Sequence, residues 1–409
     1  MGEWPLGGDQ VNTFPDDAEE AARVERVRQD LPALGREAYL NNGTFGPLPR
    51  QSVEAMREVL DRESAEGRIG PHYHERSREL AEQTRGLLAR RFGLTDDEVA
   101  LTPRTTDGLN IALWGIDWRS GDEVLTTRDE HPGLLVPLAT LVRRAGVRVM
   151  YVETPREPSR DAWLQAFASR RSGRTRAIAF SHVLWTNGDV LPVDELGGWA
   201  RREGVLSLVD GAQAAGALAC DLRRSQLDFY AMPGQKWLCG PDGTGALYVA
   251  RERIDECLPS FVGYLSGTSA DAAGGGFEPA QGARRYEIGS LSQAQLAGLA
   301  ASLLWQEEHD PAWAALRISA LGAELRQSLQ EIPGLEILTR RQEEASGLVS
   351  FRVAGRAAED VSAELGQAGF RVRDLPAPHA SVRVSCGFYT LREELVRLVE
   401  AVTKLAGAV

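Results

Sequence analysis

The sequence predicts an α/β protein with a mostly parallel, seven-stranded central sheet, followed by a smaller α+β unit. Two observations support this prediction. Short apolar segments alternate with helical segments through the first two thirds of the chain, and a separate series of strands and helices completes it. The 409 residues are enough for two domains. We expect a large domain over residues 25–290 and a small domain made of residues 1–24 and 291–409.

The elements of the large domain follow in order. Helical patterns with charges on one face cover residues 52–65 and 75–92. The strands that come next are interrupted by helical segments over 108–114, 133–145, 159–172 and 193–202. The seven predicted strands are 98–101, 123–126, 148–152, 176–182, 205–210, 229–232 and 244–249. Strands separated by helices form parallel sheets that are covered on both faces.

The remaining third of the chain changes character. Residues 266–276 are rich in Gly, Ser and Ala, and we expect a mobile loop there. A long helix is predicted from about 292 to 329. The α+β unit then consists of a strand over 347–353, a helix over 358–366, a strand over 382–386 and a helix over 391–406.

Composition excludes several classes of protein. A net charge of −12 argues against nucleic acid and anionic membrane as partners. Cys220, Cys239, Cys257 and Cys386 form no C-x-x-C pair, so neither a zinc site nor a disulfide framework is expected. No apolar run has transmembrane length, and the acidic N-terminus is unlike a signal peptide. We expect a cytoplasmic protein without a bound metal.

Lysine is almost absent from the chain. The 46 basic residues include only two lysines, Lys236 and Lys404, and the other 44 are arginine. Lys236 lies in a glycine-flanked apolar turn, 234–241, whereas Lys404 lies in a helical pattern and is expected to be solvated. Arginine cannot form a Schiff base, but a lysine in a low-dielectric pocket can. Lys236 is therefore the first candidate catalytic residue.

Polar residues follow several of the predicted strands. Asp210 ends strand 205–210, where ligands bind in open α/β sheets, and a buried carboxylate there needs a partner such as a protonated pyridine nitrogen. The alternative is that Asp210 caps the following turn. His131 and His182 also follow strands, and either imidazole could stack on an aromatic cofactor or be purely structural.

Two further segments carry groups suited to binding anions. Thr105 and Thr106 precede a helix whose N-terminus could bind a phosphate, although plain N-capping would explain the same residues. In strand 382–386, Arg383 and Ser385 face one side, and a guanidinium at a domain cleft suits a substrate carboxylate. Position alone is weak support for Arg383, because most of the 44 arginines are surface charges.

Together these segments resemble the class V aminotransferase family of pyridoxal-5′-phosphate (PLP) enzymes, which includes the cysteine desulfurases. The matching motifs occur in the order Thr105-Thr106, Glu130-His131, Ser181-His182, Asp210-Gly211-Ala212-Gln213 and Lys236. The resemblance spans residues 39–390. It implies a PLP-dependent transferase of fold type I, with PLP as the cofactor and an amino acid as the small-molecule substrate.

The resemblance also implies roles for individual residues. Lys236 would bind PLP covalently and act as acid and base at Cα, Asp210 would pair with the pyridine nitrogen, and His131 would stack on the ring. Gln213 would bind the phenolic oxygen, while Thr105, Thr106 and Gln235 would contact the phosphate. Ser290 would reach the partner subunit's phosphate, which implies a homodimer with shared active sites. Arg383 would bind the substrate carboxylate, with Asn42 and Trp185 also lining the substrate pocket.

Within the family the likeness is strongest to the cystine C–S lyase branch, through residues 113–118, 130–133, 181–185 and 347–351. Gln235 replaces the usual histidine and Trp185 replaces an asparagine found in desulfurases. The loop cysteine of desulfurases is also missing, because residues 370–382 contain none. Cys239 and Cys386 are the cysteines that could replace it, although free cysteines are more often small buried hydrophobes.

We therefore expect β-elimination on cystine, a cysteine S-conjugate or a sulfoxide, which releases pyruvate and ammonia. A cysteine desulfurase or an isopenicillin N epimerase-like enzyme of the same family is the alternative. A non-catalytic α/β scaffold is disfavoured, since the chain has neither a P-loop nor a G-x-G-x-x-G motif that opens a βαβ unit.

Overall fold

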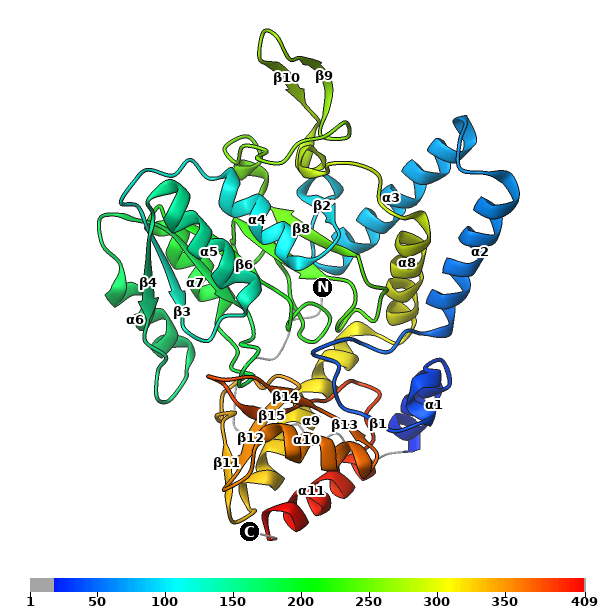
Figure 1. The fold of residues 1–409 in the computed structure, drawn as a ribbon, viewed down its shortest axis with the longest axis vertical. Helices are drawn as coiled ribbons and strands as arrows, with labels where there is room; N and C mark the ends of the chain where they lie inside the picture. The colour runs from blue at the N-terminus through cyan, green and yellow to red at the C-terminus, as the bar shows by residue number, and fades with distance from the viewer. Residues whose placement is uncertain (1–17, 408–409) are drawn as a thin grey trace.

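A computed structural model describes residues 18–407, and its centre is a seven-stranded sheet with the order β2-β8-β7-β6-β5-β3-β4 (Figure 1). Strand β8 is antiparallel to both neighbours, and every other pair in this sheet is parallel. The strands are β2 Val99–Thr102, β3 Glu123–Thr127, β4 Arg148–Val152, β5 Thr175–Ser181, β6 Leu206–Asp210, β7 Phe229–Pro233 and β8 Gly245–Val249. The predicted fold class is confirmed.

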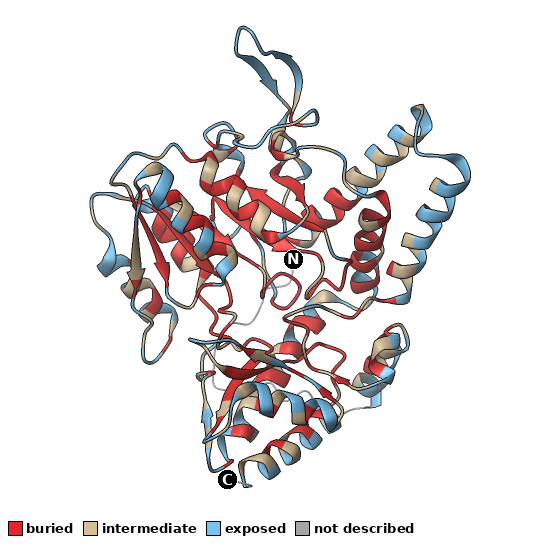
Figure 2. Cartoon of the chain, viewed as in Figure 1, coloured by how far each residue is buried: buried red, intermediate tan, exposed pale blue. Residues whose placement is uncertain are grey.

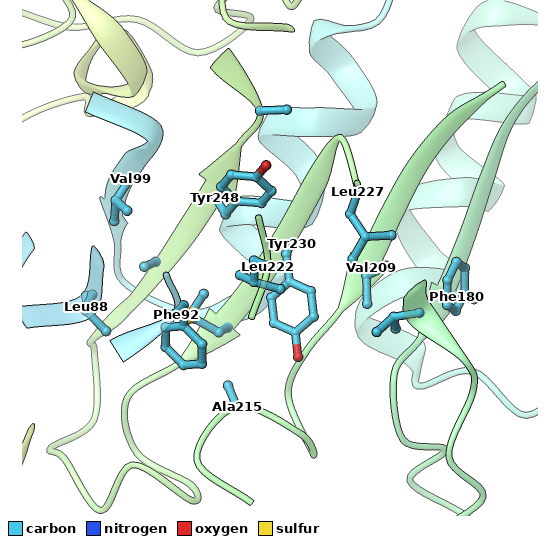
Figure 3. Close-up of a cluster of buried hydrophobic side chains, with 14 of the residues drawn as sticks. Leu88, Phe92, Val99, Phe180, Val209, Ala215, Leu222, Leu227, Tyr230 and Tyr248 are labelled. Atoms are coloured by element: carbon cyan, nitrogen blue, oxygen red, sulfur yellow. The ribbon is translucent and has the colours of Figure 1, made fainter. Parts of the chain in front are cut away.

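Helices cover both faces of this sheet because neighbouring strand residues point to opposite sides. On β6, Leu208 packs with α4 (Thr105–Gly115) and α5 (Pro132–Ala145). Val209 packs on the other face, with the aromatic cluster that includes Phe92 and Tyr230 (Figure 3). The helices on that face are α3 Pro71–Arg91, α6 Arg160–Arg170, α7 Val193–Arg202 and α8 Gln293–Glu308. The buried strands lie between the two helical layers (Figure 2).

The C-terminal unit is an antiparallel sheet of order β11-β12-β15-β14, packed against helices. Its strands are β11 Leu335–Ile337, β12 Leu348–Val353, β14 Arg373–Leu375 and β15 Ser381–Ser385, and its helices are α9 Pro311–Gln330, α10 Ala358–Gln367 and α11 Arg392–Ala406. Phe351 and Leu398 are fully buried in its core. This unit lies below the large sheet in Figure 1.

The N-terminal segment reaches the C-terminal unit. Strand β1 (Ala38–Tyr39) pairs with β13 (Phe370–Arg371), and α1 (Ala18–Gln29) lies beside the same unit (Figure 1). The predicted domain boundary at residue 25 falls within α1, and residues 1–17 lie outside the described residues. The division 25–290 against 1–24 and 291–409 stays a proposal. The chain also contains α2 (Arg50–Glu66) and the 3₁₀ helices Pro32–Gly35, Asp96–Glu98, Arg251–Arg253 and Gly282–Tyr286.

Two predicted elements are wrong. Residues 266–276 form no simple loop but a projecting hairpin of β9 (Gly267–Asp271) and β10 (Gly276–Pro279), whose turn is held by Asp271 Oδ1 accepting from two backbone amides (Figure 1). The long helix predicted over 292–329 is broken into α8 and α9. Asp310 has a positive φ of 56° and caps α9, and Pro311 begins it without an amide hydrogen.

Candidate active site

The candidate site lies where the carboxyl ends of the parallel strands meet an N-terminal segment, residues 41–46. Lys236 follows β7 in a turn onto which this segment packs, since Gly46 N donates to the carbonyl of Gln235 at 2.8 Å. A Cβ atom at Gly46 would lie 2.1 Å from the Lys236 carbonyl oxygen. Only glycine allows such a close approach, so Gly46 fixes the distance between the segment and the lysine turn.

Lys236 is half-buried, and its amine makes no hydrogen bond or ion pair within residues 18–407. Burial lowers the pKa of Lys236 to about 8; the Asp210 carboxylate opposes this shift and the Arg383 charge reinforces it. A substantial fraction of the amine is therefore neutral near physiological pH. A neutral amine can attack an aldehyde and can accept a proton from carbon.

Asp210 is buried at the end of β6, with only 4% of its surface exposed. Its Oδ1 accepts a hydrogen bond from Ala212 N at 2.9 Å, so it does cap the following turn. Burial raises the pKa of Asp210, while the Lys236 charge and the Ala212 amide lower it. The second carboxylate oxygen has no hydrogen bond among the described residues, so a cationic partner can still bind it.

Glu130, which precedes His131 in the Glu130-His131 motif, belongs to this site, although the sequence predicted no role for it. It is 1% exposed and accepts hydrogen bonds from Thr127 Oγ1 at 2.8 Å and Ser181 Oγ at 2.5 Å. Burial raises the pKa of Glu130 to about 7, the two hydroxyls oppose this shift, and the nearby Asp210 charge adds to it. A cation bound at Asp210 would relieve the repulsion between these two carboxylates.

His131 caps α5 and packs against Trp185. Its Nδ1 accepts from Gly133 N at 2.9 Å, and the two ring centroids are 5.0 Å apart at 82°. His131 is exposed in the single chain. Desolvation of its ring by the surrounding side chains, together with the Lys236 and Arg383 charges, lowers the pKa of His131 to about 4, so the ring is neutral at pH 7. A neutral flat imidazole at a strand end suits stacking on an aromatic ring.

His182 has the structural role that sequence analysis left open. It is 4% exposed, and its Nδ1 lies 3.0 Å from the hydroxyl of Tyr230 in the core of the large domain. Burial lowers the pKa of His182 to about 4. This histidine is packed inside the domain, behind the strand end.

The N-terminus of α4 is built to bind an anion. Arg104 occupies the N-cap position without a side-chain cap, so the N-capping alternative for Thr105 and Thr106 is wrong. A Cβ atom on Gly133 would lie 2.8 Å from Thr106 Oγ1 and 3.0 Å from His131 Nδ1, which places this helix end beside the histidine. Uncapped amide groups in the first turn of a helix favour a phosphate.

Arg383 is a buried charge that has no counterion within residues 18–407. It is 3% exposed, and its Nη1 and Nη2 donate to the Trp185 carbonyl at 2.9 Å and to Thr44 Oγ1 at 3.3 Å. No acidic side chain pairs with it in the described part of the chain, where its Nε also has no partner. Burial, with the charge of Arg373, lowers the pKa of Arg383 to about 10. A carboxylate from outside the protein would satisfy this guanidinium.

The other predicted site residues differ in their contacts: some have hydrogen bonds inside the protein, and Ser290 is exposed. Gln213 binds the Gly43 carbonyl through Nε2 at 2.9 Å and accepts from Trp237 through Oε1 at 3.0 Å, so part of its amide holds segment 41–46 in place. The amide oxygen of Asn42 is buried and accepts from Tyr389 at 2.8 Å. Gln235 lies beside Lys236, and its buried Oε1 has no partner among residues 18–407. Ser290 is exposed and bonds Tyr264, and no hydrogen bond within residues 18–407 joins it to the rest of the site.

Neither cysteine that could replace a desulfurase nucleophile is suited to that work. Cys239 and Cys386 are both fully buried, and burial raises the pKa of each thiol to about 12. Cys386 packs in the core of the C-terminal unit, on the opposite face of β15 from Arg383. The thiolate, which is the nucleophilic form, is therefore scarce at both positions.

These groups match the needs of PLP. The amine of Lys236 can react with the PLP aldehyde. The buried carboxylate of Asp210 can pair with a protonated ring nitrogen, and the amide groups at the N-terminus of α4 can bind the phosphate. Within residues 18–407 no three or more His, Cys, Asp or Glu side chains are grouped to hold a metal ion. In the same part of the chain, no helix is long and apolar enough to cross a membrane.

Comparison with known proteins agrees with this chemistry. Isopenicillin N epimerase of Streptomyces clavuligerus is 33% identical over 384 residues, 90% of this chain and 94% of that protein. A probable cysteine desulfurase of Pyrococcus abyssi is 28% identical over 91% of this chain and 94% of its own length. The solved structure of a C-DES mutant with glycine covalently linked to PLP superimposes with a TM-score of 0.86 at 29% identity, covering 92% of this chain and 98% of that one.

A second C-DES structure, described as a cystine C–S lyase in complex with its product cysteine persulfide, gives a TM-score of 0.85 at 30% identity over 91% of this chain and 99% of that one. The protein is thus a PLP-dependent enzyme of fold type I and of the cysteine desulfurase and C–S lyase type. The sequence model of Aminotransferase class-V matches residues 38–398, almost the whole described chain, and the protein belongs to that family.

Proposed function

We propose that the enzyme is a C–S lyase that eliminates the sulfur group from Cβ of cystine or a cysteine S-conjugate or sulfoxide, with pyruvate and ammonia as the final products. The observation that carries this proposal is that Arg383, which has no counterion among residues 18–407, is accompanied by two buried cysteines, Cys239 and Cys386, whose thiol pKa values are raised. Arg383 selects an amino acid by its carboxylate. Without a thiolate to take up sulfur, the sulfur group can leave only as a free product.

Each residue of the site has a defined task in this reaction. PLP supplies a sink for the electrons that remain at Cα when its proton leaves. Lys236, with its lowered pKa, takes that proton. Asp210 keeps the cofactor's ring nitrogen protonated, and Arg383 holds the substrate carboxylate, so that the Cα–H bond stays oriented toward the lysine.

The test is incubation of the purified, PLP-loaded protein with cystine, S-substituted cysteines and free cysteine. We expect pyruvate from the disulfide or a conjugate. Turnover of free cysteine to alanine, with sulfur transferred to a thiol, would instead identify a desulfurase. As a control, Lys236→Ala is expected to release no pyruvate, and borohydride reduction should tag the peptide that contains Lys236 only in the wild-type protein.

A second candidate activity is inversion at Cα, since the relative from S. clavuligerus is an epimerase and matches 90% of the chain. Inversion needs a proton donor on the face of the substrate opposite Lys236. Incubation in deuterated water distinguishes the two reactions: an epimerase gives Cα-deuterated substrate of inverted configuration without pyruvate.

We also propose that two copies of the chain associate, as the resemblance implies for Ser290. Ser290 forms hydrogen bonds with Tyr264. The segment that contains Tyr264 exposes several apolar side chains, because Phe261, Val262 and Tyr264 are 72%, 51% and 71% exposed in the single chain. Exposed apolar clusters of this kind mark protein–protein contacts. Sedimentation velocity should give a dimer, and Tyr264→Asp should give a monomer that binds PLP more weakly if Ser290 serves the partner's site.

A further inference from the structure

His379 lies at the edge of the active site, although no motif drew attention to it. It follows β14 in the turn that leads to β15, four residues before Arg383. Its amide donates to the Pro376 carbonyl at 3.0 Å, and its own carbonyl accepts from Ser381 Oγ at 2.8 Å. The backbone of His379 is therefore fixed on both sides.

The side chain of His379 continues a row of rings that begins at the cofactor-stacking histidine. Its ring centroid is 6.0 Å from that of Trp185, at 71°, and Trp185 in turn contacts His131 at 5.0 Å. The carbonyl of Trp185 also accepts from Arg383. His379, Trp185 and the carboxylate-binding arginine thus belong to one connected wall, and the His379 side chain is 25% exposed.

A carboxylate lies close to the His379 ring, just beyond hydrogen-bond distance. Asp129 Oδ1 lies 3.7 Å from His379 Nδ1, and Asp129 Oδ2 accepts from Thr154 Oγ1 at 3.2 Å, which anchors the aspartate from another segment. With Nδ1 facing Asp129, Nε2 points to the other side of the ring. Among residues 18–407 no hydrogen bond engages Nε2. A histidine with one ring nitrogen facing an aspartate and the other available is suited to proton transfer.

We propose that His379 is the acid that protonates the departing sulfur, with Asp129 as its positioning residue; this proposal rests on the proposed lyase function. Arg383 holds the carboxylate and Lys236 serves the Cα proton, so the Cβ substituent extends toward the remaining wall. The C–S bond breaks with its electron pair on sulfur, and the His379 Nε2 proton passes to the departing group, which gives a thiol from a cysteine S-conjugate and a persulfide from cystine. The electrons from the Cα–H bond form the Cα–Cβ double bond, and water returns a proton to His379.

How much the reaction rate depends on His379 is set by the acidity of the leaving thiol. A thiol more acidic than that of cysteine, whose pKa is about 8.5, leaves readily without a proton, whereas an alkyl thiol does not. General acid catalysis is worth about 10²-fold or more. His379→Gln should therefore lower kcat/KM for S-ethylcysteine about 10²-fold, but leave that for S-(4-nitrophenyl)cysteine nearly unchanged. Asp129→Asn should produce the same selective loss to a smaller degree.

The experiment measures pyruvate release from a series of S-substituted cysteines by the PLP-loaded wild type, H379Q, D129N and the control H72Q, which changes a histidine whose side chain is 88% exposed on α3. The dissociation constant of L-alanine, which has no leaving group, is measured by absorbance titration. The expected result is a steeper dependence on leaving-group acidity in H379Q with unchanged alanine binding.

An equal loss for every substrate, or weaker alanine binding that accounts for the loss, would show a structural or substrate-positioning role and overturn the assignment of His379. The wild-type data distinguish a wrong assignment of His379 from a wrong lyase proposal. If the wild type releases no pyruvate from any member of the series, both proposals are wrong. If the wild type releases pyruvate and kcat/KM of H379Q depends on leaving-group acidity as steeply as that of the wild type, only the assignment of His379 is wrong.

Discussion

Arg383→Met is expected to lower activity strongly while changing the stability of the fold only slightly. In the wild type, burial and Arg373 lower the pKa of Arg383 from 12.5 to about 10, which corresponds to about 3 kcal/mol spent on keeping the buried group charged. Its hydrogen bonds to the Trp185 carbonyl and to Thr44 return about 1 kcal/mol each. The substitution removes both contributions, so the net change in unfolding free energy is about 1 kcal/mol or less.

Activity should change far more than stability. A guanidinium–carboxylate pair contributes two charge-assisted hydrogen bonds of about 1.5–3 kcal/mol each, so kcat/KM for pyruvate release is expected to fall about 10²- to 10⁴-fold. Stability is followed by thermal unfolding without substrate, and the unfolding temperature should stay within about 2 °C of wild type.

Arg85→Met is the matched control. Arg85 is also buried, at 1% exposure, but it pairs with Glu287 through Nη1 at 2.5 Å and Nη2 at 3.3 Å. Although burial alone lowers it, the pKa of Arg85 is raised overall by Glu287. Removal of Arg85 leaves Glu287 unpaired and should cost about 3–5 kcal/mol. If R383M unfolded as early as R85M, or kept its activity within tenfold, Arg383 would be a structural residue and the reasoning would be wrong.

Three other perturbations test the rest of the site. Cys239→Ala should leave pyruvate release within about twofold, because a thiol with a pKa of about 12 is not a nucleophile; a tenfold loss would contradict this. Asp210→Asn should lower kcat about 10²-fold or more, since a neutral amide cannot hold the cofactor's ring nitrogen protonated, and wild-type turnover would refute that role. The rate at which the cofactor-free protein binds PLP should rise about tenfold per pH unit up to the pKa of Lys236, near 8, because only the neutral amine reacts. A rate that is flat from pH 6 to 8 would count against a lysine pKa near 8.

Local sequence was sufficient for most elements of the fold. All seven central strands and the helices between them lie within a few residues of their predicted bounds. The reason is that the spacing of apolar residues, which are the residues that become buried, differs between strands and helices. The two errors arose where two sequence signals pointed to different structures. In 266–276 the Gly-rich composition indicated a loop although the flanking residues pair as a hairpin. In 292–329 the helical periodicity indicated one helix although Asp310 and Pro311 begin a new one.

The sequence by itself determined which reactive groups are available: one of only two lysines placed in an apolar turn of an arginine-rich chain, a carboxylate at a strand end and no loop cysteine before Arg383. Only the tertiary structure decided which groups act together. The burial of Arg383 with no counterion in the described part of the chain is a property of its surroundings. The contacts of His379 with Trp185 and Asp129 join segments more than 190 residues apart. The spacing of side chains along a strand or helix follows from the local sequence. The desolvation of a side chain and its contacts with distant residues arise only when distant segments pack together.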